Sequence, residues 1–174
     1  MPFLWRISNY ALLSGEGGLH YSARWHTAGH RIVYLAESPA GALIEVLAHL
    51  EIDEADWPRS YQLLQAEHPA RMRMTTLDPL RTKNWQADLA VTRKLGDDWL
   101  RSGSSALARV PSAIVPETWN VLLNPQHAEA ALLSATQALE YPARGFHSLE
   151  KCRCAAASLG NRPQPCAGHR IPSP

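Results

Sequence analysis

One continuous block of the sequence, SARWHTAGHRIVYLAESPAGALIEVLAHLE from Ser22 to Glu51, places a short apolar run directly before an amphipathic one. Ile32–Ala36 has the length and composition of a buried strand, with Tyr34 on one face and its neighbours on the other. Ser38 and Pro39 then supply an N-cap and a first-turn proline, so a helix should begin there. The block therefore predicts a buried strand followed at once by a helix.

Glu45 is the unusual residue of this predicted helix. Apolar side chains recur at the spacing of a core-facing stripe, at Leu43, Val46, Leu47 and Leu50. At about 100° per residue, Glu45 lies roughly 150° from the centre of that stripe. The carboxylate therefore faces either solvent or a cleft.

Arg24, Tyr34 and Glu45 allow two interpretations. An arginine beside an apolar strand could bind a phosphate or carboxylate through two hydrogen bonds, and a tyrosine could stack on a flat ring. A glutamate in a cleft could stabilise a developing cation or act as a base. Alternatively, the three are a surface arginine, a core tyrosine and a solvated helix glutamate. Spacing alone favours this second interpretation.

The rest of the chain predicts short strands and one more helix. Strands are expected at Trp5–Ile7 and Tyr61–Ala66, a loop over residues 75–85, and a helix over residues 87–103. Prolines at positions 111, 116 and 125 divide the next segment into short strands joined by shaped loops. The segment HAEAALLSATQALE, residues 127–140, has a helical composition.

Composition excludes several classes of protein. A chain of 174 residues with 45% apolar and 19% charged residues is typical of one globular domain. The formal net charge of +1 gives no indication of a nucleic-acid or anionic membrane partner. No apolar run approaches the ~20 residues that span a bilayer, and the N-terminus lacks a signal-peptide core. We therefore expect a cytoplasmic protein.

Metal and nucleophile motifs are weak. Cys152, Cys154, Cys166 and His169 are zinc-type ligands, but their spacing is irregular, and no His-Glu-x-x-His or paired Cys-x-x-Cys occurs. The sequence therefore predicts no metal site. His20, His26, His30 and His49 are interpreted as surface or capping residues. Ser112 has no Gly-x-Ser-x-Gly elbow around it. The turn SGEGG at residues 14–18 lacks the lysine of a Walker A loop.

Four segments, taken together and in order, resemble the RES domain family: LWRIS, GGLHYSARWHTAGHRIVYLAESPAGALIEVLAHLE, VPSAIVPETWNVLLNPQH and YPARGF. This family comprises the toxins of RES–Xre toxin–antitoxin pairs and is named for an arginine, a glutamate and a serine. The resemblance identifies Arg24, Glu45 and Ser112 as these three residues and as catalytic. It also assigns Tyr34 as the family tyrosine, and Arg6 matches a recurrent position near the start.

The resemblance implies a fold and an activity. The fold is α+β and ADP-ribosyltransferase-like, with a split, mostly antiparallel β core and flanking helices around an NAD cleft. The implied function is an NAD-degrading toxin that cleaves the nicotinamide–ribose bond by hydrolysis or phosphorolysis. NAD is then a substrate, with inorganic phosphate as a potential co-substrate and no prosthetic group. Arg24, Tyr34, Arg6 and Asn120 would bind NAD, while Asn124 and His127 would shape the site from outside.

The resemblance also implies a partner and leaves alternatives open. An Xre-type antitoxin is expected to cover the cleft. The chain could instead transfer ADP-ribose to a protein, or it could be a catalytically impaired module that only binds the antitoxin. The family pattern covers a domain over residues 1–146, and residues 147–174 form a tail, expected to be flexible, without a family counterpart. Ala23 stands where the family usually has glycine, and YPARGF lacks the usual aspartate.

Overall fold

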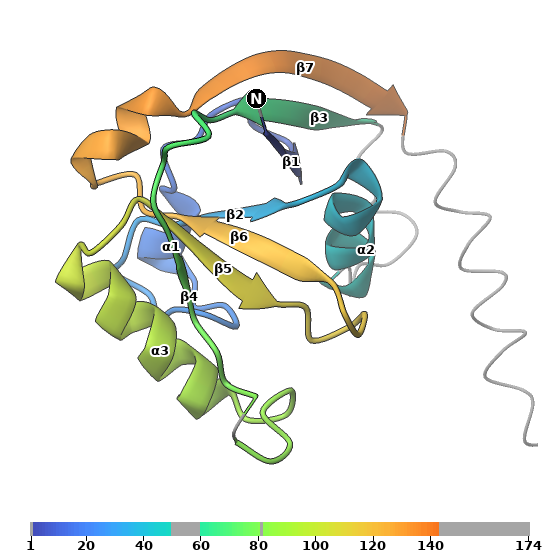
Figure 1. Ribbon diagram of the computed structural model, residues 1–174. Coiled ribbons are helices and arrows are strands. Elements are labelled where there is room, and N and C mark those ends of the chain that lie inside the picture. The colour runs from blue at the N-terminus through green and yellow to red at the C-terminus, as the bar shows by residue number, and fades with distance from the viewer. Residues whose placement is uncertain (1, 50–59, 81, 143–174) are drawn as a thin grey trace, which may run out of the picture.

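A seven-stranded sheet forms the centre of the computed structural model, which describes residues 2–49, 60–80 and 82–142 (Figure 1). Within the described residues the strand order is β4-β5-β6-β2-β1-β3-β7. The strands are β1 (Phe3–Ser8), β2 (Val33–Ala36), β3 (Ser60–Glu67), β4 (Met74–Thr76), β5 (Leu107–Pro111), β6 (Trp119–Leu123) and β7 (Ser134–Pro142). β4 and β5 are parallel, and the other neighbouring pairs are antiparallel. The predicted α+β class is confirmed.

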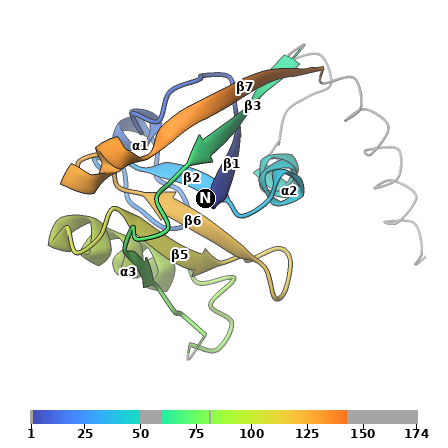
Figure 2. The same cartoon turned by 45° about the horizontal axis from the view of Figure 1, so that its top comes forward.

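The sheet is split between β1 and β2. These strands share a single register pair, Trp5 with Ala36. By contrast, β1 pairs with β3 along its whole length, and β2 does so with β6. Figures 1 and 2 show β3 and β7 diverging from β5 and β6. This is the split, mostly antiparallel core that the resemblance to the RES family implied.

Three α-helices and a 3-10 turn flank the sheet in the described part of the chain: α1 (Gly17–His20), α2 (Pro39–His49), α3 (Leu89–Ser102) and η2 (Ala128–Leu132). The Ser38 hydroxyl accepts the Gly41 N–H at 3.0 Å, which is the predicted cap of α2. The Asp88 carboxylate accepts the first amides of α3, and Gly103 ends that helix with a left-handed φ of 56°. Local capping chemistry thus sets the limits of both longer helices.

Apolar side chains alternate between two clusters on opposite faces of the sheet. Val33 and Leu35 of β2 join one cluster, while Ile32 and Tyr34 pack against the other. The second cluster lies beneath α3 and contains three tryptophans, Trp25, Trp85 and Trp99. The alternation predicted for the buried strand is therefore present, and Tyr34 lies on the face that α3 covers.

Two predicted segments differ in the structure. Residues 127–140 were expected to be helical, but residues 134–142 form β7, which pairs with β3 from Ser134 opposite Glu67 to Pro142 opposite Ser60. Helical structure in that region is confined to η2. The open edge of β3 offers backbone hydrogen bonds along a whole strand, and this tertiary pairing outweighs local helix propensity. The expected loop over 75–85 also begins inside β4. The predicted tail, its cysteines and Arg144 lie outside the described residues.

Candidate functional site

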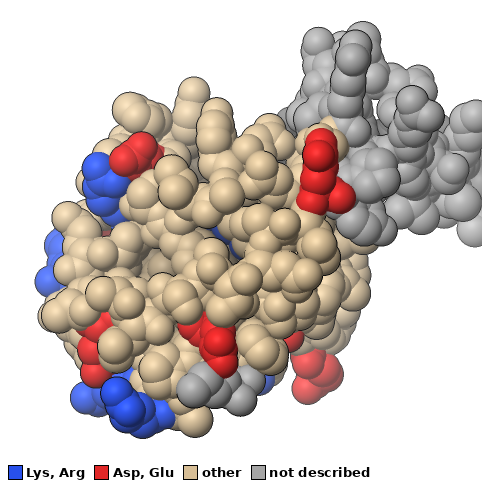
Figure 3. Space-filling model, turned by 90° about the horizontal axis from the view of Figure 1, so that it is seen from above, with Lys and Arg blue, Asp and Glu red and all other residues tan. Residues whose placement is uncertain are grey.

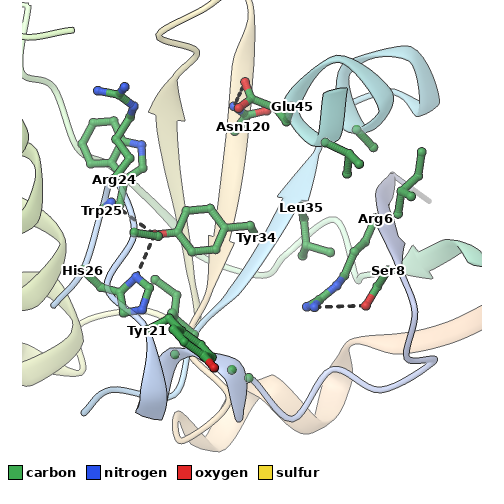
Figure 4. Close-up of a pocket in the computed structure, with 18 of the residues that line it drawn as sticks. Arg6, Ser8, Tyr21, Arg24, Trp25, His26, Tyr34, Leu35, Glu45 and Asn120 are labelled. Carbon is green, nitrogen blue, oxygen red and sulfur yellow. Dashed lines mark hydrogen bonds between the residues drawn. The ribbon is translucent and has the colours of Figure 1, made fainter. Parts of the chain in front are cut away.

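A pocket of about 1010 Å³ opens between the two halves of the sheet. Its walls come from β1, the segment 14–26, β2 and α2, with Pro111, Ala113 and Asn120 closing one side. The lining includes all but one of the predicted site residues, namely Arg6, Arg24, Tyr34, Glu45 and Asn120. Figure 4 shows Tyr34 near the centre, with Arg24 to its left, Arg6 to its right, and Glu45 with Asn120 above it. The fold therefore gathers side chains that are far apart in the sequence.

Glu45 is held in the pocket wall by donors from two other segments. Its Oε1 atom accepts a hydrogen bond from Asn120 Nδ2 at 2.7 Å and another from Ser112 Oγ at 2.9 Å. Asn120 belongs to β6, and Ser112 directly follows β5. Hydrogen bonds to an ionised carboxylate are stronger than neutral ones and fix its orientation. Of the two surroundings that the sequence left open for Glu45, solvent or a cleft, the structure shows the cleft.

Ser112 lies behind Glu45 and is not a lining residue. Its hydroxyl donates to Glu45 and accepts the amides of Ile114 and Val115, each at 3.2 Å. The side chain is 9% exposed. A hydroxyl whose proton and acceptor sites are engaged in this way serves to position the carboxylate. The structure thus places the predicted serine in contact with Glu45.

Arg24 belongs to a segment that α3 holds through backbone contacts. Thr92 Oγ1 donates to the Arg24 carbonyl at 2.7 Å, and Arg93 Nε donates to the Ala23 carbonyl at 2.9 Å. The Asp97 carboxylate accepts both the amide and the hydroxyl of Thr27, at 3.0 and 2.8 Å. These anchors fix the backbone on both sides of Arg24.

The Arg24 side chain makes one described hydrogen bond, from Nη1 to the Gln86 carbonyl at 2.7 Å. Since a guanidinium carries five N–H groups, most of its donors remain available to an anion in the pocket.

Gly96 of α3 explains how this helix comes so close to the segment that carries Arg24. A Cβ atom there would lie 1.7 Å from the Trp25 carbonyl oxygen, so only glycine fits.

Arg6 extends from β1 into the other side of the pocket. It is half-buried, and among the described residues its hydrogen-bond partner is Ser8 Oγ at 3.4 Å, with no carboxylate in contact. Burial lowers the pKa of Arg6, although an arginine remains protonated at any physiological pH. A partly desolvated cation without a carboxylate is suited to bind an anion.

Tyr34 lies at the centre of the pocket, and burial raises its pKa well above the ordinary value. The Trp25 amide donates to its hydroxyl at 3.1 Å, and His26 Nδ1 lies 2.8 Å from the same oxygen. The interpretation of His26 as a surface or capping residue is therefore wrong, because its side chain is 2% exposed. It directly follows the buried Trp25, which draws it into the interior.

Other contributors to the site were not foreseen from the sequence. Gly15 and Gly18 of the SGEGG turn pack against Ile32 and His30, where a Cβ atom would meet backbone at 2.6 and 2.4 Å. Tyr10 and Tyr21, largely exposed, line the pocket rim. In α3, Thr92 and Gly96 lie four residues apart on one face of the helix, and two small residues at this spacing are a sequence signal that this face packs closely against another segment. Asn124 and His127 do not line the pocket and bond locally, to Gln126 and Glu129.

Surface and metal-type features add little to the site. On the face in Figure 3, acidic and basic side chains of the described residues lie near one another, without a continuous basic surface. Within the described ranges, no group of three or more His, Cys, Asp or Glu side chains could hold a metal ion. Likewise, no helix in the described part of the chain is long and apolar enough to cross a membrane.

Comparison with known proteins gives consistent matches over most of the chain. The RES domain model matches residues 3–144. Toxin Res of Pseudomonas putida is 50% identical over 127 residues, which is 73% of this chain and 87% of that protein. Toxin Res of Yersinia enterocolitica is 34% identical over 131 residues, covering 74% and 85%. The Prs ADP-ribosylating toxin of a Sphingobium species is 36% identical over 143 residues, covering 75% and 87%.

A solved structure shares the fold. One chain in the crystal structure of the M. tuberculosis MbcT–MbcA toxin–antitoxin complex superposes with a TM-score of 0.65 at 15% identity. The match covers 86% of this chain and 88% of that one. The range that the family model matches includes Arg6, Arg24, Tyr34, Glu45 and Ser112. This chain belongs to the RES domain family.

Proposed function

We propose that this RES-domain toxin cleaves the nicotinamide–ribose bond of NAD in the pocket between the two halves of the sheet. The observation that carries the proposal is Glu45, a carboxylate in the pocket wall that Ser112 and Asn120 hold by one oxygen. Departure of nicotinamide leaves an oxocarbenium-like ribose, and a carboxylate held in advance stabilises that charge without reorganising.

The remaining lining residues suit the other parts of a dinucleotide. The pyrophosphate carries two negative charges, which match the guanidinium groups of Arg6 and Arg24. The ring of Tyr34 offers a flat surface for the nicotinamide or ribose. In hydrolysis, the C–N bond breaks and a water oxygen bonds to the ribose carbon, giving nicotinamide, ADP-ribose and a proton. In phosphorolysis, a phosphate oxygen takes the place of water.

A second candidate is transfer of ADP-ribose to a protein. It is favoured by the similarity to the Prs ADP-ribosylating toxin of Sphingobium, which is 36% identical over 143 residues. The same carboxylate would serve, with a protein side chain as the nucleophile in place of water or phosphate. The partner expected in either case is an antitoxin, in line with the toxin–antitoxin complex that shares this fold. We assign it to the Xre type and expect it to cover the pocket.

The test compares purified wild type with Glu45→Gln, with and without phosphate, and identifies the products formed from NAD. Glutamine keeps an oxygen for Ser112 and Asn120 but removes the charge, so we expect turnover to fall by roughly 10²–10³-fold. Glu37→Gln is the matched control, because Glu37 pairs with Arg109 at 2.7 Å and does not line the pocket. Equal NAD consumption by wild type and Glu45→Gln contradicts the proposal. If the NAD is labelled in its ADP-ribose part, label found only on protein supports transfer.

A further inference from the structure

His26 is the one histidine among the described residues whose ring is almost fully buried in contact with a predicted site residue. Its Nδ1 atom lies 2.8 Å from the Tyr34 hydroxyl oxygen. Its Nε2 atom is buried and has no hydrogen-bond partner among the described residues. The ring also stacks at a tilt on Tyr34, with centroids 5.7 Å apart. Such a contact invites the question of which group carries the shared proton.

The backbone limits the answer. The Trp25 amide points at the Tyr34 oxygen at 3.1 Å, and an amide can only donate. The phenol oxygen therefore already accepts one hydrogen bond. Between this oxygen and His26 Nδ1 there is room for one proton, which belongs either to the phenol or to the imidazole. If the phenol carries this proton, the hydrogen of the neutral imidazole is on Nε2. If Nδ1 of the imidazole carries it, Nε2 has a bare lone pair.

The surroundings of His26 favour the first case. The Tyr34 O–H needs an acceptor, and among the described residues His26 Nδ1 is the one partner of this oxygen that can accept. If Nδ1 carried the hydrogen instead, the phenol oxygen would accept two hydrogen bonds and its own O–H would have no acceptor among the described residues. Nε2 thus carries the hydrogen, and Nδ1 accepts from the phenol.

The geometry points to His26 as a positioning residue, whose Nδ1 accepts a hydrogen bond from the Tyr34 hydroxyl so that Tyr34 presents a fixed, neutral ring to the pocket. This role rests on the proposed function in one respect, namely that the ring contacts NAD. It has a definite consequence for mechanism. The Tyr34 proton is directed inward at His26, so Tyr34 contributes a surface and supplies no proton to the substrate.

The proton assignment is tested without any substrate. Long-range ¹H–¹⁵N spectra of ¹⁵N-histidine-labelled protein at neutral pH report the tautomer of each ring, and loss of one signal set in His26→Asn assigns His26. We expect a neutral ring with hydrogen on Nε2. Hydrogen on Nδ1, or an imidazolium, overturns the inference. This measurement decides the point even if the chain fails to turn over NAD.

The positioning role is tested by a matched set of variants. In His26→Asn the amide oxygen can take the place of Nδ1 as acceptor, whereas His26→Leu removes the acceptor, and Tyr34→Phe removes the donor but keeps the ring. We expect His26→Asn to behave like wild type. Tyr34→Phe and His26→Leu should raise KM for NAD roughly three- to tenfold, the value of one hydrogen bond, with kcat little changed.

The double variant adds a test of coupling. Since both single changes break the same hydrogen bond, His26→Leu with Tyr34→Phe should raise KM no further than either alone. Two outcomes overturn the role: a loss of kcat above about 10²-fold in Tyr34→Phe, which would show that the phenol proton is used, or equal damage in His26→Asn and His26→Leu. If His26→Leu does not fold, Tyr34→Phe and His26→Asn still show whether His26 has the positioning role or the phenol proton is used.

Discussion

The charged side chains of the pocket differ in their partners: Glu45 is held by hydrogen-bond donors, whereas Arg6 has no carboxylate beside it among the described residues. Glu45 has two donors on one oxygen, from Ser112 and Asn120, and is held as an oriented carboxylate. Arg6 is half-buried and contacts no carboxylate among the described residues. A buried charge without a counter-ion costs stability, so its presence is better explained by ligand binding than by folding.

Arg6→Met separates these two roles. Methionine keeps much of the aliphatic length and removes the charge. Because no ion pair to a described residue is lost, we expect the melting temperature to stay the same or rise slightly. KM for NAD should rise about tenfold or more, since a hydrogen bond to a charged group contributes roughly 1.5–3 kcal/mol. The measurements are thermal unfolding and initial rates of NAD turnover.

Arg31→Met is the control for Arg6, because Arg31 pairs with Glu16 at 3.2 Å and does not line the pocket. That variant should leave KM unchanged. A melting temperature that drops strongly in Arg6→Met, with KM unaltered, would show that Arg6 has a structural role instead.

His26 gives a prediction on pH and stability. Burial lowers its pKa, and among the groups facing it the Asp97 carboxylate opposes this shift while His30 adds to it. Below about pH 6.5 the unfolded chain binds a proton that the folded chain resists. Stability is therefore full above that pH and falls as the pH drops, by at most about 1.4 kcal/mol per pH unit.

Urea unfolding at pH 7.5 and 5.5 measures this effect. Wild type should lose more stability between the two pH values than His26→Asn does. His20→Asn, a change at an exposed histidine, should behave like wild type. If wild type and His26→Asn lose the same amount, the buried histidine does not contribute to the pH dependence.

At this scale the local pattern singled out Glu45, whereas Arg24, Tyr34 and Ser112 entered the candidate site through the resemblance to the RES family. Glu45 departs from the apolar stripe of its helix, and Arg24 and Tyr34 lie in the distinctive block before it. His26 carries no such signal, since its burial depends on Trp25 and Tyr34 meeting in space. Ser112 was foreseen as a member of the site. Its place behind Glu45 follows from the register of β5 and β6, which local pattern does not specify.

At the scale of elements, α3 is the support for the segment that carries Arg24. Its polar side chains Thr92, Arg93 and Asp97 bond to residues 23–27, and Gly96 lets the helix approach the Trp25 carbonyl. The sequence predicted the helix from its moderately periodic apolar positions. It did not predict this polar face, because polar helical residues usually face solvent.

Gly96→Ala tests this support. A Cβ atom 1.7 Å from the Trp25 carbonyl oxygen forces the helix and the segment apart, and overpacking of this kind costs about 1–3 kcal/mol or more. We expect lower stability in urea unfolding and a raised KM for NAD, since Arg24 moves with the segment. Gly17→Ala is the control for stability, because a Cβ atom there meets nothing within 4 Å. Equal stability of the two variants would contradict the close packing.

Strand pairing explains which elements were predicted and which were not. The alternation of β2 and the cap of α2 are clear in the sequence, and strands were also expected at the positions of β1 and β3. β7 has no such pattern: its described side chains are mostly exposed, and it is held by pairing with β3. A strand defined by its neighbour cannot be recognised from its own residues, and the alanine-rich segment over residues 127–140 favours a helix.

At the scale of the whole molecule, the two halves of the sheet meet at a single register pair, and the pocket opens between them. A ligand that contacts both β1 and the β2–β6 half joins the halves through bonds that the free protein lacks. Binding to the folded state alone raises stability by RT ln(1 + [L]/Kd), or about 2.7 kcal/mol at 100 times Kd. NAD should therefore stabilise the entire chain.

Glu45→Gln makes this measurable, because it should bind NAD without consuming it. With NAD at 100 times Kd, we expect its melting temperature to rise by roughly 5–10 °C. ADP-ribose, which keeps the pyrophosphate, should give part of the shift, and nicotinamide alone little, since Arg6 and Arg24 are assigned to the phosphates. Arg6→Met combined with Glu45→Gln should lose most of the response. An unchanged melting temperature in saturating NAD would show that the pocket between the halves does not bind the dinucleotide.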